Sequence, residues 1–463
     1  MSVDLRGKTV VIVHGWSDKW ESMKPVGEVL KATGARVFYA DYDSREDKAV
    51  YEDFAEGLDQ EIAKRNLFNG TKLNFITHST GALVVRQWLV QYPKRQERVD
   101  NIVMLAPANF GSPLANVGNS LIGKVFKGQH KVDDRFEVGR EILHGLELAS
   151  PFSWRLAEAD LLGENGTIYG ADRIRTSVIT GHAGYSSVRR FVNKPGTDGT
   201  IVVAGANLNS RYLKLDFEER EGQRTSRWHN FDIAENPRAA VPELPFAVHN
   251  HLHHASILDL AENPALRSQV IQALAVGPGE YRDMKGRFDR FTAAQVAADE
   301  DHRFQQLLFR VVDERNCPVR DYHLEFNAWR PERLTQVGEG PRHIPLGAKM
   351  DPVEEGKSGE LDALLAENAH SHSQDSGYKR FLFKPEEIEK VAGDFVLTMR
   401  IDARSGDRNI RYRTDKVANY LLYHPKPDFP VNIRPFFENT TTLIQVKLDR
   451  ESTLVRCLDH PAG

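Results

Sequence analysis

The stretch FITHSTGALVV, residues 75–85, decides the fold, because an apolar run passes through Ser79 directly into a helical pattern. The residues before Ser79 are typical of a buried strand, and those after Gly81 contain no helix breaker. So sharp a strand-to-helix turn lifts the serine hydroxyl above the edge of a sheet. A helix that begins near Thr80 also directs backbone N–H groups and the positive end of its dipole at this point, where an acyl oxyanion would form.

Short β-branched runs alternate with amphipathic helical stretches on both sides of this turn, up to residue 110. Such alternation predicts an α/β fold with a doubly wound, mostly parallel sheet and crossover helices. The expected strands are Thr9–Val13, Arg36–Tyr39, Leu73–Thr77 and Asn101–Leu105, and the expected helices are Met23–Thr33, Val50–Arg65 and Gly81–Tyr92.

Helical segments interrupt this alternation between residues 113 and 170, which predicts a lid or cap insertion. Further strands are expected at Thr176–Thr180 and Ile201–Ala204, and a helical run at Ile257–Val276. We therefore expect a first domain over residues 1–279.

A charged connector, residues 280–302, leads to an expected second domain over residues 303–463. Two domains suit the chain length, because one hydrophobic core rarely grows beyond about 250 to 300 residues. Apolar residues recur here with a period of two, which predicts a β-sandwich-like domain, and the polar stretch Pro341–Gly377 is expected to be a long loop. The expected strands are Phe304–Val312, Tyr322–Phe326, Tyr378–Phe383, Phe395–Ile401 and Thr440–Leu448.

Three motifs resemble those of α/β-hydrolase lipases and esterases. THSTG, residues 77–81, resembles the GxSxG nucleophile elbow, with Thr77 in place of the first glycine. VVIVHGWSD, residues 10–18, resembles the HG loop, and LAPANFGSPLA, residues 105–115, resembles the segment that follows the next strand in bacterial lipases. The resemblance implies that Ser79 is the nucleophile, and that the N–H groups of Trp16 and Thr80 form the oxyanion hole.

The same family requires an acid and then a histidine after the serine in chain order. Asp198 lies in GTDGTIVV, which resembles the acid-bearing segment of lipases, and we prefer it to Asp216 and Asp232, although an ordinary Asp-Gly turn would look alike. The segment FAVHNHLHHASILDL offers four histidines for the base. The resemblance favours His254, with His251 as second choice over His249 and His253.

The histidine cluster has an alternative interpretation as a zinc site, because imidazole is a common zinc ligand. Its alternating spacing differs from the three- or four-residue spacing of helical ligands, and no HExxH motif accompanies it, so we expect neither a metal nor an organic cofactor. His370 and His372 are expected to be solvated in the long loop. The acidic residues Asp362, Asp375 and Asp402 are too scattered to predict a calcium site.

Charge and composition exclude several classes of partner. With 61 basic and 65 acidic residues and a net charge of −4, the chain lacks the positive field that nucleic acid binding requires. The two cysteines, Cys317 and Cys457, are too few for a disulfide framework. The first residues resemble no signal peptide and no apolar run is long enough to span a bilayer, so we expect a cytoplasmic protein, with signal-independent secretion left open.

The motifs together predict a serine hydrolase of carboxylic esters. Leu121, Ile122, Val125 and Phe126 of the expected lid, with the nearby lysines, suit either transient contact with a membrane surface or packing on the lid's own core. An apolar lid favours a lipidic ester, as in a lipase or phospholipase, including one delivered as a toxin. The alternatives are an acyltransferase with the same triad and a non-catalytic binding protein on the same scaffold. Nothing in the sequence predicts an oligomeric state.

Overall fold

The computed structural model describes most of residues 4–454 in two compact units. The first unit comprises residues 1–210, 232–304 and 439–441, and the second comprises residues 211–231, 305–438 and 442–463. Within residues 4–454, the structure does not describe 17, 45, 117–138, 163–165, 187–189, 191, 221–222, 231–242, 299–302, 331–354, 414–419 and 424–435.

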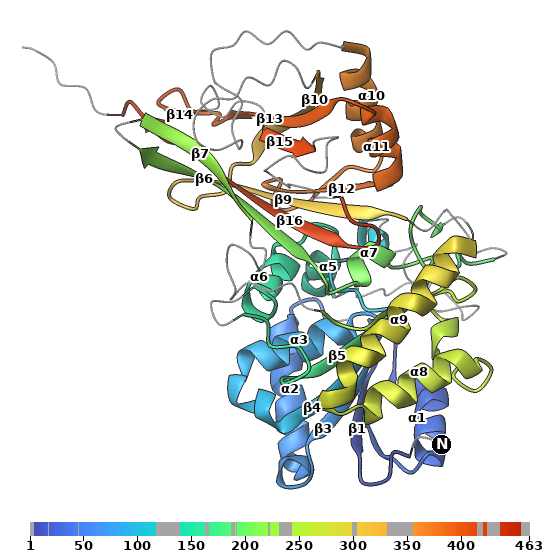
Figure 1. The fold of residues 1–463 in the computed structure, drawn as a ribbon. Coiled ribbons are helices and arrows are strands. Elements are labelled where there is room, and N and C mark those ends of the chain that lie inside the picture. The colour runs from blue at the N-terminus through green and yellow to red at the C-terminus, as the bar shows by residue number, and fades with distance from the viewer. Residues whose placement is uncertain are drawn as a thin grey trace, which may run out of the picture. The chain divides into compact units, whose positions relative to one another are not determined.

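A six-stranded parallel sheet, in the order β2-β1-β3-β4-β5-β8, forms the centre of the first unit (Figure 1). Strands β3, β4 and β5 are buried along most or all of their length, as expected of parallel strands covered by helices on both faces. The mostly parallel sheet predicted from the sequence is confirmed. The strands are β1 (Thr9–Val13), β2 (Arg36–Ala40), β3 (Leu73–His78), β4 (Val99–Leu105), β5 (Arg175–Gly181) and β8 (Phe246–His249).

Helices cover both faces of this sheet. Helix α3 packs against α2 and α6, whereas α8 packs against β4 and α9 against β8. Helices α5 and α6 lie in the expected insertion, but the apolar stripe predicted for the lid lies outside the described residues. The helices of the first unit are α1 (Lys24–Ala32), α2 (Tyr51–Lys64), α3 (Gly81–Gln91), α5 (Arg140–Leu146), α6 (Pro151–Asp160), α7 (Val203–Ala206), α8 (Pro264–Ala275) and α9 (Pro278–Ala298).

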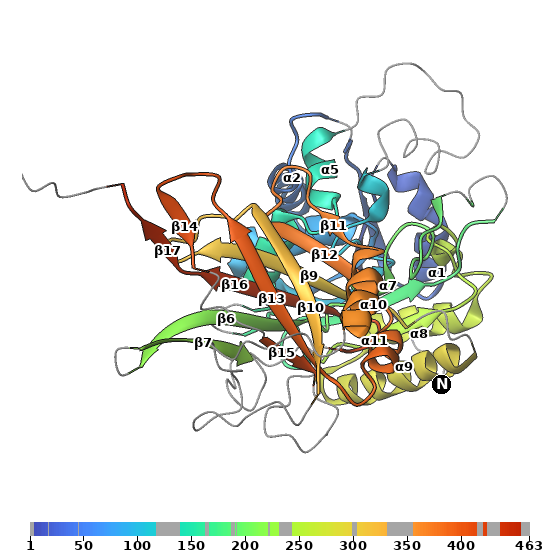
Figure 2. The same cartoon turned by 90° about the horizontal axis from the view of Figure 1, so that it is seen from above.

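The second unit holds two sheets that share one hydrophobic core. A six-stranded sheet has the order β11-β12-β9-β16-β6-β7, and a three-stranded sheet has the order β10-β13-β15. Leu307 of β9, Phe326 of β10 and Ile444 of β16 belong to that core. Residues of the two helices of this unit, α10 (Glu355–Ala366) and α11 (Pro385–Ala392), belong to it as well. In Figure 2, β10 and β13 lie over β9 and β16, which is the sandwich-like arrangement predicted from the sequence.

The elements of this second unit follow the chain in an interlaced order. Strands β6 and β7 come from the middle of the chain, whereas the others follow α9. The bounds are β6 (Arg211–Arg220), β7 (Gln223–Asn230), β9 (Gln305–Asp313), β10 (Asp321–Trp329), α10 (Glu355–Ala366), β11 (His370–Ser371), β12 (Tyr378–Phe383), α11 (Pro385–Ala392), β13 (Val396–Arg404), β14 (Ile410–Tyr412), β15 (Tyr420–Tyr423), β16 (Thr441–Leu448) and β17 (Arg450–Ser452).

Three predictions about elements were wrong. The strand expected at Ile201–Ala204 is replaced by the short helix α7, because the carboxylate of Asp198 accepts the N–H groups of Thr200 and Ile201 and turns the chain. Most of the expected connector 280–302 belongs to the long helix α9. The long loop expected at Pro341–Gly377 contains α10 and β11 in its described part.

His372 also differs from the prediction of a solvated residue. Its side chain is buried, and its Nδ1 accepts the backbone N–H groups of Gln374 and Asp375. It therefore holds a turn within the second unit. Among the helices that the structure describes, none combines the length and the apolar composition that crossing a bilayer demands.

Candidate active site

Ser79 occupies a strained turn between β3 and α3. Its φ of +54° lies in the left-handed region, which non-glycine residues rarely adopt and which costs roughly 1 to 3 kcal/mol. Two backbone hydrogen bonds hold the turn: the Ser79 N–H donates to Leu105 O at 3.2 Å, and the Ala108 N–H donates to Ser79 O at 3.2 Å. The loop that follows β4 therefore fixes the position of the serine.

Gly15 and Gly81 allow the end of β1, the turn at Ser79 and the start of α3 to lie in close contact. A Cβ at Gly15 would lie 2.9 Å from Ser79 Cβ, and a Cβ at Gly81 would overlap the carbonyl oxygens of Val13 and His14. The end of β1 therefore packs directly against the first turn of α3. Thr77, which stands where the elbow motif has a glycine, is fully buried, and its hydroxyl has no hydrogen-bond partner among the residues that the structure describes.

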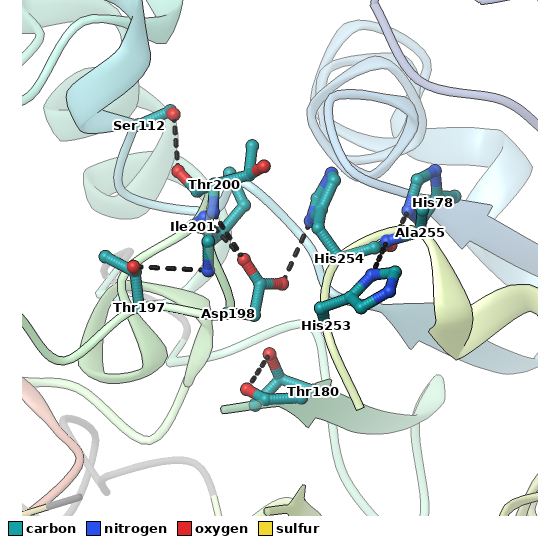
Figure 3. A network of polar contacts seen from close by, with 12 residues as sticks. His78, Ser112, Thr180, Thr197, Asp198, Thr200, Ile201, His253, His254 and Ala255 are labelled. Atoms are coloured by element: carbon teal, nitrogen blue, oxygen red, sulfur yellow. Dashed lines mark hydrogen bonds and ion pairs between the residues drawn. The ribbon is translucent and has the colours of Figure 1, made fainter. Parts of the chain in front are cut away.

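Asp198 and His254 form a buried pair, and His78 at the end of β3 lies close to His254 (Figure 3). The Nδ1–H of His254 donates to Asp198 Oδ2 at 2.9 Å, and the His254 backbone N–H donates to Asp198 O at 2.9 Å. The other carboxylate oxygen accepts the N–H groups of Thr200 at 2.9 Å and Ile201 at 2.7 Å. Because Nδ1 carries the proton that is donated to Asp198, Nε2 of His254 is the nitrogen left to accept a proton.

His78, the neighbour of the serine, contacts the segment that carries His254. Its Nε2–H donates to the backbone oxygen of His254 at 3.0 Å, and the two rings lie 4.6 Å apart. Burial, followed by repulsion from His254, lowers the pKa of His78 to about 3, so His78 stays neutral at physiological pH. The sequence analysis did not predict this contact, because it joins positions that are 176 residues apart.

The other three histidines of the cluster have separate roles. His249 Nε2 lies 2.8 Å from Gln269 Oε1, and burial lowers the pKa of His249 to about 4. His253 Nδ1 accepts the backbone N–H groups of Ala255 and Ser256 at 3.2 Å each. His251, the second choice for the base, is exposed, and no described contact joins it to Asp198. The rival acid Asp216 lies in β6, and Asp232 lies outside the described residues.

His14 lies at the end of β1, next to the expected oxyanion loop. Its ring is buried, its Nδ1–H donates to Gly15 O at 2.8 Å, and its Nε2 accepts the backbone N–H of Tyr42 at 3.3 Å. Burial lowers the pKa of His14, which favours this neutral form. The hydroxyl of Tyr42 donates to His14 O at 2.6 Å. Tyr42 carries no motif in the sequence, and the sequence analysis missed it.

All these residues meet at the carboxyl edge of the parallel sheet. Trp16 follows β1, Ser79 follows β3, Asp198 lies in the loop after β5, and His254 follows β8. Ligands of open α/β sheets bind outside this edge. Across the ranges that the structure describes, no three His, Cys, Asp or Glu side chains are grouped so as to hold a metal ion.

Comparisons with known proteins agree with this architecture. Residues 8–186 match the family model described as "alpha/beta hydrolase fold". The solved structure of phospholipase PlaB from Legionella pneumophila is 21% identical, with a TM-score of 0.73 over 99% of this chain and 97% of that chain. The structure of PlaB in complex with thio-NAD is 22% identical, with a TM-score of 0.74 over 98% of this chain and 97% of that chain.

A search of curated protein sequences found no match. At 21–22% identity, the likeness to PlaB shows a shared fold over both units of the chain. The family model covers β1 to β5 and includes the turn at Ser79. Residues 8–186 of the first unit therefore have the α/β-hydrolase fold.

Proposed function

We propose that this protein is a serine hydrolase of lipidic carboxylic esters that works through Ser79, His254 and Asp198. The observation that carries the proposal is the buried Asp198–His254 pair, which His78 links by a hydrogen bond to the residue before Ser79's strained turn at the carboxyl edge of the sheet. Backbone strain persists only where the surrounding structure over-determines it, and such positions are concentrated at active sites.

In the proposed reaction, His254 Nε2 accepts the proton of Ser79 Oγ as that oxygen attacks the ester carbonyl. Asp198 keeps His254 in the required tautomer and stabilises the imidazolium that forms. The N–H groups of Trp16 and Thr80 stabilise the oxyanion, and His254 returns its proton to the leaving alcohol. Water, activated by the same histidine, then hydrolyses the acyl-enzyme. These steps need no group beyond the side chains and backbone of this chain.

The substrate class within ester hydrolysis rests on a different observation. PlaB, which shares the fold over almost the entire chain, is a phospholipase. We therefore propose phospholipids or lysophospholipids as substrates, with contact to a membrane surface during turnover. An ester with a long acyl chain should be hydrolysed faster than acetate or butyrate esters of the same alcohol.

The test measures hydrolysis of p-nitrophenyl esters from acetyl to palmitoyl, and fatty acid release from phosphatidylcholine vesicles. Wild type should be active, Ser79→Ala should lose at least about a thousandfold in kcat, and Ser177→Ala should retain it. Ser177 is a suitable control because it is buried in β5 and its hydroxyl forms no hydrogen bond within the described part of the chain. Activity that survives Ser79→Ala would refute the proposal.

Two further measurements separate the remaining alternatives. Intact-mass analysis after treatment with a fluorophosphonate should show one label on wild type and none on Ser79→Ala. Absence of both label and turnover in wild type would favour a binding protein on a hydrolase scaffold. Addition of an alcohol acceptor distinguishes an acyltransferase, because its product would be a new ester instead of free fatty acid.

A further inference from the structure

Tyr42 connects the two backbone segments that would form the oxyanion hole. Its hydroxyl donates to His14 O at 2.6 Å, in the segment after β1, and a side-chain hydrogen bond to Thr80, at the start of α3, opposes the rise that burial causes in the pKa of Tyr42. Trp16 lies two residues beyond His14, and Thr80 itself supplies the second proposed N–H group. One hydroxyl therefore reaches both arms of the proposed site.

The arm after β1 needs such an anchor because Gly15 lies in the middle of it. Only glycine fits at this position, since a Cβ would lie 2.9 Å from Ser79 Cβ. Glycine leaves the backbone free to rotate, so the direction of the next N–H group, that of Trp16, depends on how His14 is held. Tyr42 holds His14 at both ends, with its hydroxyl on the backbone oxygen and its N–H on Nε2.

Ring contacts fix the position of Tyr42 in turn. Its ring stacks on that of His14 with centroids 4.2 Å apart and an angle of 16°, and the ring of Phe54 from α2 lies 4.9 Å away on a tilt. The bond from the Tyr42 N–H to Nε2 requires His14 to be neutral, and in this tautomer Nδ1–H donates to Gly15 O at 2.8 Å. The segment after β1 is thus held by a connected set of contacts that includes His14, Gly15 and Tyr42.

We propose that Tyr42 is a positioning residue that sets the separation of the Trp16 and Thr80 N–H groups, and so the stabilisation of the oxyanion. This inference rests on the proposed ester hydrolase function. It predicts a specific kinetic signature, because an oxyanion hole acts on the transition state more than on substrate binding. Loss of the Tyr42 hydroxyl should therefore lower kcat and leave KM nearly unchanged.

The test compares Tyr42→Phe with Tyr281→Phe. Each change removes one tyrosine hydroxyl and keeps the ring. The Tyr42 hydroxyl donates to the backbone oxygen of His14, and the Tyr281 hydroxyl donates to that of Thr176. Thr176 lies near the start of β5, at the end of the sheet away from the site. Removal of a complete oxyanion donor costs about 100- to 1000-fold in kcat, so we expect about 10- to 100-fold for Tyr42→Phe with KM within about twofold.

Active sites are counted with the fluorophosphonate before kcat is calculated, so that a partly unfolded preparation is not mistaken for a slow enzyme. Tyr281→Phe should keep the kcat of wild type. A Tyr42→Phe enzyme with kcat within about twofold of wild type per labelled site, or an equal loss in both variants, would overturn the inference. Both results leave the proposed hydrolase function intact.

Hydrogen–deuterium exchange supplies a readout that needs no turnover. Peptides that span residues 14–16 and the start of α3 should exchange at least about tenfold faster in Tyr42→Phe, whereas peptides of β5 should not change. Unchanged exchange in residues 14–16 would overturn the inference even if wild type proves inactive on every ester. Inactive wild type with faster exchange in the variant would instead refute the proposed function and retain the role of Tyr42.

Discussion

At the level of single residues, Asp198 does two things with one carboxylate. One oxygen accepts the Nδ1–H of His254, and the other accepts two backbone N–H groups that turn the chain into α7. An amide in its place would present an N–H group to His254 and favour the wrong tautomer. We expect Asp198→Asn to lower kcat by about 10⁴-fold, as loss of the triad acid does elsewhere.

Kinetics at saturating ester check this prediction, with Asp216→Asn as the matched control. Asp216 was the rival acid in the sequence, and it lies in β6 of the second unit. A comparable loss in Asp216→Asn, or activity within about tenfold of wild type in Asp198→Asn, would contradict the assignment.

His249 provides a test of pH dependence outside the proposed chemistry. Burial lowers its pKa from 6.5 to about 4, so between these two values the unfolded chain binds a proton that the folded protein does not. Stability contributed by neutral His249 is thus fully present above pH 6.5 and is lost as the pH falls towards 4. From pH 7 to pH 5 this one group should cost about 2 kcal/mol of unfolding free energy.

Urea unfolding at pH 7 and pH 5 measures this loss in wild type and in His249→Gln. The variant should lose about 2 kcal/mol less than wild type over the same interval, whatever its stability at pH 7. Equal losses in the two proteins would show that His249 does not remain neutral in the fold.

The residues of the site divide into those that carry a motif and those that do not. Ser79, Asp198 and His254 could be proposed from the sequence because strand ends, turn residues and chain order constrain them together, and the structure joins Asp198 to His254. The contacts of Tyr42 and His78 were not predicted, because each depends on which loops the sheet order β2-β1-β3-β4-β5-β8 brings together at one edge. No spacing in the sequence records that proximity.

At the level of elements, a buried ion pair joins α3, which follows the serine, to α6. Arg86 donates from Nε and Nη2 to the two oxygens of Asp160 at 2.7 and 2.9 Å, and neither side chain is exposed. Nη1 donates to the backbone oxygen of Asn109, and Tyr169 donates to Asp160 at 2.7 Å. Removal of one partner leaves an uncompensated buried charge, so Arg86→Met should cost about 3 to 5 kcal/mol.

Urea unfolding provides the measurement, and an exposed pair in α9 provides the control. Lys285 and Asp289 lie one turn apart, and such surface pairs contribute about 0.3 to 0.5 kcal/mol, so Lys285→Met should have little effect. The double variant Arg86→Met with Asp160→Leu should recover part of the loss, because no lone charge remains. Similar costs for Arg86→Met and Lys285→Met would contradict a structural role for the buried pair.

Elements with a regular spacing of apolar residues were predicted well. Elements that local side-chain hydrogen bonds determine were not. The buried strands β1 and β12 have the predicted bounds, and β3 and β4 differ from them by one or two residues. The apolar run Ile201–Ala204 has the composition of a strand, but the carboxylate of Asp198 begins a helix there instead. A local side-chain hydrogen-bond pattern thus outweighed composition, because one carboxylate accepts two N–H groups.

At the level of the whole molecule, the two domains are not consecutive in the chain. The hairpin of β6 and β7 leaves the first unit and joins the sheet of the second, where β6 pairs in parallel with β16. The sequence suggested a simple boundary because period-two patterning is conspicuous only after residue 303. The charged hairpin was overlooked because it forms the edge of its sheet, where polar residues are common.

This interlaced order predicts how truncated chains behave. A fragment of residues 1–303 keeps the hairpin but lacks β16, so β6 would expose a row of unpaired N–H and C=O groups that favours association with other chains. We expect that fragment to aggregate. A second fragment also ends at residue 303, but a short Gly/Ser linker replaces its residues 211–242. This fragment should stay soluble and monomeric, because the linker joins ends of the chain that are already close. Asn209 exchanges two hydrogen bonds with the backbone of Leu244, at 2.8 and 2.9 Å.

Soluble yield and size-exclusion chromatography compare the two fragments with the full chain. Both fragments lack residues 439–441, which contribute to the first unit through the bond from Asn207 to Asn439 O and that from Thr441 to Ala204 O. Any difference between the fragments therefore reports on the unpaired hairpin alone. If the fragment with the hairpin is as soluble and monomeric as the one without it, β6 does not depend on β16 for its protection, and the boundary after residue 303 would serve as a true domain boundary.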